Sequence, residues 1–78
     1  MFNHLVPGMT YLIEYRHDVE IVHQGTFVRY VDDHCAEFRD VACLYDSTGP
    51  CTHSDFMYFY SNVPRSYTPV TLIRYPVF

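Results

Sequence analysis

The sequence predicts a small all-β protein that forms a single domain over residues 1–78. Three observations predict this fold. Eight Tyr and six Phe occur among 78 residues, at the alternating spacing of half-buried strands. Turn-forming residues interrupt the apolar segments at short intervals, and no segment keeps helical periodicity for about ten residues. A chain of this length is close to the lower limit for one self-sufficient core, so one compact unit is expected.

The first expected strand covers residues 9–16, where apolar and polar side chains alternate. A second extended segment covers residues 19–31. Gly25 lies in its middle, and a glycine inside a strand often marks a bulge or a bend. We therefore expect either one long bent strand or two short strands.

A polar turn at Asp32-Asp33 is expected to connect this segment to a third strand over residues 34–42. The two strands form a hairpin in which Phe27 pairs with Phe38. In the third strand Ala36 and Phe38 lie on one face and Glu37 and Arg39 on the other, because neighbouring side chains in a strand point to opposite faces.

The second half of the chain begins with its longest predicted loop, residues 45–53, which is rich in turn formers. The fourth strand, residues 54–60, has apolar side chains on both faces, so we expect both faces to be covered. Prolines interrupt the next segment, where a short 3₁₀ turn is expected over residues 61–64. A fifth strand over residues 70–75 completes the prediction.

Taken together, five or six short antiparallel strands, a tight hairpin before the third and a turn before the last resemble an SH3-like or Tudor-like small barrel. The segments 25–30 and 36–41 are also similar to a pattern in short uncharacterised proteins of large double-stranded DNA viruses. These resemblances imply a five- to six-stranded antiparallel SH3-like barrel that serves in a virion or as a host-facing binding module. The chain has no Trp, so recognition of proline-rich ligands is not expected.

The charge pattern disfavours nucleic acid as the main partner. Nine acidic residues oppose five arginines, there is no lysine, and the formal net charge is −4. Binding to a phosphate backbone requires clustered basic residues, and these arginines are scattered. No apolar stretch is long enough to span a membrane, and the N-terminus has no secretory pattern. The expected location is therefore cytoplasmic, or virion-associated as the viral resemblance implies.

The cysteines and histidines supply a weak alternative zinc site. Its candidate ligands are Cys43, Cys51 and His53, with Cys35 or His34 as the fourth. Structural zinc sites usually take their ligands from close pairs such as Cys-x-x-Cys, which this chain lacks, so reduced thiols and no cofactor are expected. A Cys43–Cys51 disulfide would close the long loop in an oxidising setting. The odd number of cysteines and the missing secretory signal argue against it.

No arrangement of residues predicts an enzyme. Asp32, Asp33, His34 and Cys35 are adjacent, but His34 and Cys35 would point to opposite faces of a strand and so could not share a proton. A small barrel also has little room for a pocket that excludes water. We therefore expect a protein without catalytic residues.

The surplus of aromatic residues is the main functional signal. A small barrel cannot bury all of them, so some are expected to be exposed or covered by a partner. The predicted function is a structural or assembly protein that docks on copies of itself or on a larger protein through exposed aromatic faces. The candidate docking residues are Phe56, Tyr58, Tyr60, Tyr67, Tyr75 and Phe78.

A reader module is the alternative function. In a Tudor-like fold, aromatic and acidic side chains form a cage that binds a methylated Lys or Arg through cation–π contacts. Asp55, Tyr58 and Tyr60 are the candidates for such a cage. Such a cage requires several aromatic side chains to converge on one point, whereas docking requires only that they be exposed, so docking is the preferred interpretation.

Overall fold

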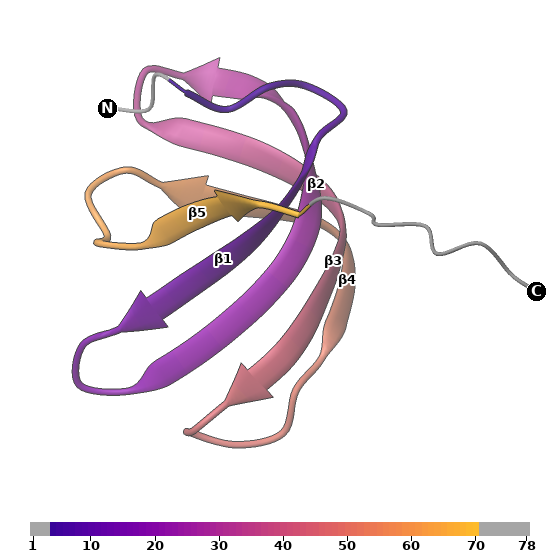
Figure 1. Cartoon of the computed structure of the whole chain (residues 1–78). Coiled ribbons are helices and arrows are strands. Elements are labelled where there is room, and N and C mark those ends of the chain that lie inside the picture. Colours follow the sequence, from indigo (N-terminus) through magenta and orange to yellow (C-terminus); the bar gives the residue numbers. More distant parts are fainter. Residues whose placement is uncertain (1–3, 71–78) are drawn as a thin grey trace, which may run out of the picture.

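The computed structural model describes residues 4–70, which form one antiparallel sheet of five strands (Figure 1). The strands are β1 (Thr10–Arg16), β2 (Glu20–Asp32), β3 (Cys35–Asp46), β4 (His53–Tyr60) and β5 (Ser66–Pro69). The prediction of a small all-β protein is therefore confirmed. Residues 4–70 contain no helix with the length and hydropathy needed to span a bilayer.

The sheet has the strand order β4-β3-β2-β1-β5. The first four strands are neighbours in both sequence and space, whereas β5 returns to pair with β1. The sheet is strongly curled, and one side of it is concave (Figure 1). It is nevertheless open, since β4 and β5 lie at opposite edges and do not pair within residues 4–70. Five antiparallel strands agree with the expected number, while closure into a barrel is not observed.

A bulge at Gly25 interrupts the pairing of β2 with β3. Between two regular pairs, β2 has one residue, Gly25, where β3 has two, Asp40 and Val41. Asp40 has a φ of 52°, a left-handed conformation that suits the extra residue of a bulge. Bulges increase the local bend of a strand. The second segment is thus one long strand with an irregularity at Gly25, the first of the two predicted alternatives.

Phe38 lies at the centre of the core on the concave side of the sheet. Its ring centroid is 5.3 Å from that of Phe59, 5.4 Å from Phe27, 6.1 Å from Tyr67 and 6.2 Å from Tyr11. These rings come from all five strands, and β5 is not a neighbour of β3 in the sheet. The curl therefore brings distant strands into contact through aromatic side chains. The predicted pairing of Phe27 with Phe38 is confirmed.

The position of the last described strand differs from the prediction. β5 covers Ser66–Pro69, a segment that was expected to be interrupted by its prolines. Because β5 lies at the edge of the sheet, a proline at its end removes no required hydrogen bond. Of the strand predicted over residues 70–75, only Val70 lies within the described residues, and it is not in a strand.

Glu37 is a buried acidic residue. Its side chain points to the convex side of the sheet, as expected, but the residue is 8% exposed. Arg29 Nε donates a hydrogen bond to Glu37 Oε1 at 3.0 Å, so the buried carboxylate is paired. Tyr58 lies opposite Glu37 in the sheet. The Tyr58 side chain thus helps to cover Glu37, which the local sequence alone would not place in a buried position.

Candidate functional site

Three aromatic side chains form an exposed row on the convex side of β4, which we call the aromatic stripe. Phe56, Tyr58 and Tyr60 are 58%, 48% and 52% exposed, while Met57 and Phe59 alternate with them and point into the interior. We expected both faces of this strand to be covered, and only the interior face is. Exposed apolar rows of this kind are typical of interaction surfaces.

The stripe lies against the outward-facing side chains of β3. The register places Phe56 opposite Arg39, Tyr58 opposite Glu37 and Tyr60 opposite Cys35. Cys35 is buried, and its thiol raises the pKa of the Tyr60 hydroxyl, through its negative charge when ionised and through a hydrogen bond. The aromatic stripe is therefore supported by neighbouring side chains in a fixed strand register.

Of the other predicted docking residues, Tyr67 is described by the structure and does not join the stripe. Tyr67 is half-buried on the concave side, where its ring stacks on Phe38. Burial raises the pKa of the Tyr67 hydroxyl, and the positive charge of Arg65 opposes this effect. Tyr75 and Phe78 lie outside the residues that the structure describes.

The residues of the predicted methyl-lysine cage do not share a face. Strand alternation places Asp55 on the side of Met57, opposite to Tyr58 and Tyr60. A cage requires the acidic group and the aromatic rings to converge on one cation. Tyr58 and Tyr60 lie on the same face of the strand, but the Asp55 carboxylate lies on the other.

Two of the three cysteines are close together. Cys43 Sγ and Cys51 Sγ are 2.7 Å apart, and both thiols are free. The contact with Cys43 is the main reason that the pKa of the Cys51 thiol is raised to about 11. Cys35 lies at the opposite end of β3 from Cys43. Within residues 4–70 no three His, Cys, Asp or Glu side chains are placed to share a metal ion, so the alternative zinc set is not assembled.

Oxidised glutathione is expected to convert Cys43 and Cys51 into an intramolecular disulfide, because their sulfur atoms are already adjacent. Each disulfide formed releases two reduced glutathione molecules, and the protein loses two hydrogen atoms, which intact mass spectrometry detects. The crosslink spans eight positions in sequence, and loop closure of this length predicts a stabilisation of about 2–3 kcal/mol in urea unfolding.

The matched control is Cys51→Ser, which keeps Cys43 and Cys35 but removes the adjacent thiol. This variant should form only mixed disulfides with glutathione. If the unmodified chain also forms only glutathione adducts, the two sulfur atoms do not meet in solution as the structure places them.

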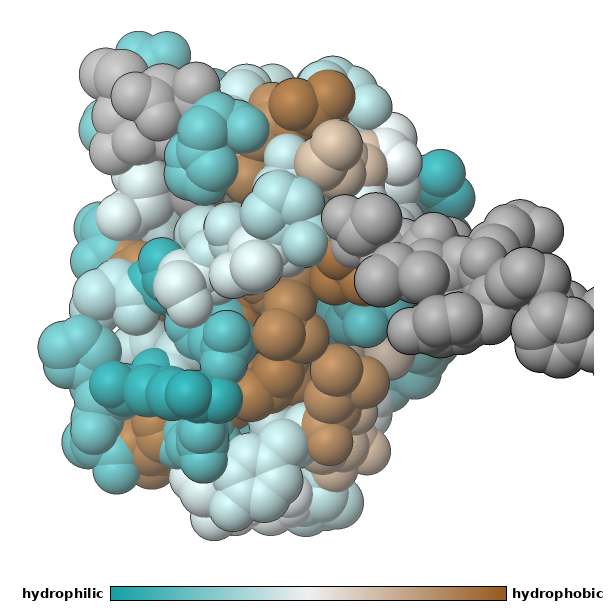
Figure 2. Space-filling model, in the orientation of Figure 1, coloured by the Kyte–Doolittle hydropathy of each residue, from teal (hydrophilic) through white to brown (hydrophobic). Residues whose placement is uncertain are grey.

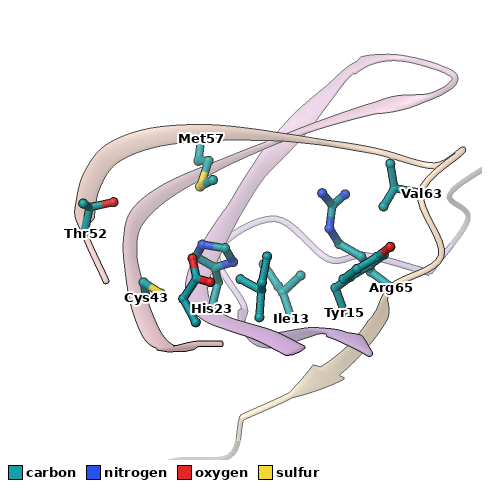
Figure 3. A pocket seen from close by; sticks show the side chains of 10 residues that line it. Ile13, Tyr15, His23, Cys43, Thr52, Met57, Val63 and Arg65 are labelled. Carbon is teal, nitrogen blue, oxygen red and sulfur yellow. The ribbon is translucent and has the colours of Figure 1, made fainter. Parts of the chain in front are cut away.

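A pocket of about 350 Å³ occupies one end of the concave side (Figure 3). Its apolar walls are formed by Ile13, Ile21, Met57 and Val63, and Arg65 extends into it. From the sequence we expected little room for a pocket that excludes water. The bulge beside Gly25 shifts the alternation of β3, and this shift turns Cys43 rather than Ala42 toward the pocket.

Arg65 and His23 dominate the electrostatics of this pocket. The Arg65 guanidinium carbon lies 4.9 Å from the centre of the Phe59 ring, a cation–π contact. Burial, followed by the positive charge of Arg65, lowers the pKa of His23, which favours the neutral imidazole. Asp46 at the rim has the opposite effect on His23, and Asp46 itself accepts hydrogen bonds from Thr48. Nothing in the sequence around Arg65 indicated a site.

No protein-family model, curated protein or solved structure matches this chain. The function is therefore argued from the aromatic stripe and the pocket themselves.

Proposed function

We propose that this protein is a non-enzymatic assembly module whose strand β4 docks an extended strand of another protein molecule. The observation that carries the proposal is the combination of an exposed aromatic stripe with a sheet edge on the same strand. Added strands bind through backbone hydrogen bonds, and the side chains beside them give specificity. The resemblance to small viral proteins supports a virion or the cytoplasm as the setting.

The outer edge of β4 offers backbone hydrogen-bonding groups. Within residues 4–70, β4 pairs with β3 and with no other strand. Ser61, the residue after β4, donates its backbone N–H to the His34 carbonyl oxygen at 2.8 Å. This bond shows that the odd-numbered residues along β4 direct their backbone groups toward β3. By the alternation of an antiparallel ladder, the backbone groups of Phe56 and Tyr58 point away from β3. They are available to an incoming strand.

The composition of β4 does not protect this edge. Natural edge strands avoid association through Lys, Pro, bulges or very short length. β4 has eight residues, pairs with β3 without a register shift, and contains neither Lys nor Pro. Asp55 is its one acidic residue. The edge therefore combines open backbone groups with side chains that favour contact, since Tyr and Phe are enriched at interfaces.

A second copy of this chain is the partner that fits the edge most directly. If two β4 strands pair antiparallel with Met57 on the two-fold axis, Phe56 of each copy lies opposite Tyr58 of the other. The outward backbone groups of these residues then meet, and aromatic cross-strand pairs add to the stability. In this register Asp55 lies opposite Phe59 of the other copy, so no like charges are opposed.

The curl of the sheet and the return of β5 to β1 support the SH3-like class for this module, because they bring the two sheet edges toward each other. No observation favours the reader alternative, since Asp55 and the tyrosines of the stripe lie on opposite faces.

Analytical ultracentrifugation of the full chain tests the proposal. The protein should form dimers or larger species, and Tyr58→Lys should weaken association at least about thirtyfold, the effect of losing a central aromatic anchor. Tyr45→Lys is the matched control, because Tyr45 is 50% exposed and lies beyond the part of β3 that pairs with β4. It should associate like the unmodified chain.

Two results would contradict self-association through β4. One is a monomeric full chain at concentrations up to about 1 mM, the weak end of specific binding. The other is equal weakening by Tyr58→Lys and Tyr45→Lys, which would assign association to general surface hydrophobicity.

A further inference from the structure

We propose that the concave pocket binds a small organic carboxylate with an apolar body, whose charged end is held by Arg65. The pocket lies on the opposite side of the sheet from the aromatic stripe, so this binding site is independent of the proposed docking. Its volume of about 350 Å³ is at the lower end of the range for small-molecule sites.

The first argument is that Arg65 has no ionic partner among the residues that the structure describes. In the part of the chain that the structure describes, the arginines Arg16, Arg29 and Arg39 each form an ion pair with Asp or Glu, and Arg65 forms none. This chain carries nine acidic residues against five arginines, so there are enough carboxylates for every arginine to form an ion pair. A cation left unpaired inside a pocket is therefore a specific feature of this site.

The second argument is an unsatisfied donor. Arg65 Nη1 is buried and lacks a well-formed hydrogen bond within residues 4–70, and the neutral Tyr67 hydroxyl, to which the Arg65 side chain hydrogen-bonds, does not balance the guanidinium charge. Buried polar groups without partners are rare in folded proteins because each one costs stability. An anionic oxygen in the pocket would accept this N–H, and charge-assisted hydrogen bonds to guanidinium are among the stronger ones.

The third argument is the direction of Arg65. Figure 3 shows its guanidinium reaching into the pocket from the side of Val63, with Met57 and Ile13 lining the space around it. Phe59 contacts the guanidinium at 4.9 Å and restrains it in this position. The side chain is thus preorganised, which reduces the entropy lost on binding.

The pocket's charge and lining define the class of ligand. Arg65 is its one positive charge when His23 is neutral, so the site suits a single negative charge rather than a phosphate chain. Asp46 at the rim disfavours a second anionic group. The apolar walls from Ile13, Ile21 and Met57 suit a hydrocarbon body. A carboxylate joined to an aliphatic chain satisfies both parts of the site.

Methyl NMR spectroscopy with octanoate as the probe tests this inference on the unmodified chain. Octanoate should shift the methyl signals of Ile13, Ile21 and Met57 in a saturable way. Octanamide has the same shape and no charge, so it should bind about tenfold more weakly or worse, because the charge-assisted bond is lost. Equal affinity for the two probes, or no saturable shift with octanoate, would overturn the assignment.

Variants of Arg65 give a second readout. Arg65→Gln should lower octanoate affinity by about tenfold to a hundredfold, while Arg65→Lys should retain part of it because the charge remains. The matched control is Arg39→Gln, which removes an exposed arginine on the other face and should bind octanoate normally. If Arg39→Gln weakens octanoate as much as Arg65→Gln does, net charge rather than the pocket governs binding. If Arg65→Gln fails to fold, the comparison of octanoate with octanamide decides the question.

Discussion

Phe38→Ala is expected to remove a large share of the free energy of unfolding of the protein. Phe38 is fully buried and contacts four other aromatic rings, from Tyr11, Phe27, Phe59 and Tyr67. Truncating a core Phe costs about 3–5 kcal/mol, through lost burial and the cavity left behind. Domains of this size have a free energy of unfolding of only about 4–12 kcal/mol. Urea unfolding followed by circular dichroism measures the loss.

Phe56→Ala is the matched control for this substitution. It removes the same side chain from β4, where Phe56 is 58% exposed, and should change the free energy of unfolding of the monomer by about 0.5 kcal/mol or less. Similar losses for the two variants would mean that Phe38 is not the centre of the core.

Gly25→Ala is expected to destabilise the protein by about 1–3 kcal/mol, the usual cost of overpacking a core. A Cβ atom added at Gly25 would lie 2.9 Å from Val41 Cγ2 and 3.4 Å from the Arg39 carbonyl oxygen. Val41 is buried and its short side chain cannot move away freely. The added methyl group therefore forces the bulge apart, which thermal unfolding should report as a lower midpoint.

Gly49→Ala provides the comparison within the same chain. Its added Cβ meets no atom within 4 Å, and its backbone is not left-handed. The substitution should be neutral or stabilise by up to about 1 kcal/mol, through a less flexible unfolded chain. Equal destabilisation by both substitutions would show that close contact at the bulge is not the cause.

The hairpin of β2 and β3 shows which part of the fold follows from local sequence. Alternating side chains on both sides of a polar turn predict its strands, and they correctly pair Phe27 with Phe38. Gly25 correctly indicated an irregularity in the pairing of these strands. What the pattern could not show is that the extra residue lies in β3, at Asp40. A glycine indicates that two strands approach each other closely, but it does not show which residue of the neighbouring strand forms the bulge.

The aromatic stripe and the pocket differ in how far they could be predicted. The alternation of side chains placed Phe56, Tyr58 and Tyr60 on one side of a strand. The chain also has more aromatic residues than its core can bury, which indicated that some of them are exposed. The pocket depends on Arg65, which lies in a segment between two prolines and directly before β5, a strand that was predicted further along the chain. Neither feature has a periodicity that sequence analysis can use.

The sequence by itself determined the all-β class, the alternation of buried and exposed side chains in β1 and β4, and the hairpin around Asp33. These depend on interactions between residues near each other in the chain. Tertiary structure alone decided the burial of Glu37, the contact of Cys43 with Cys51, the pairing of β5 with β1 and the lack of an ion pair for Arg65 within residues 4–70. The physical reason is that each of these depends on strand register and sheet curvature, which are set by packing around Phe38 rather than by neighbouring residues.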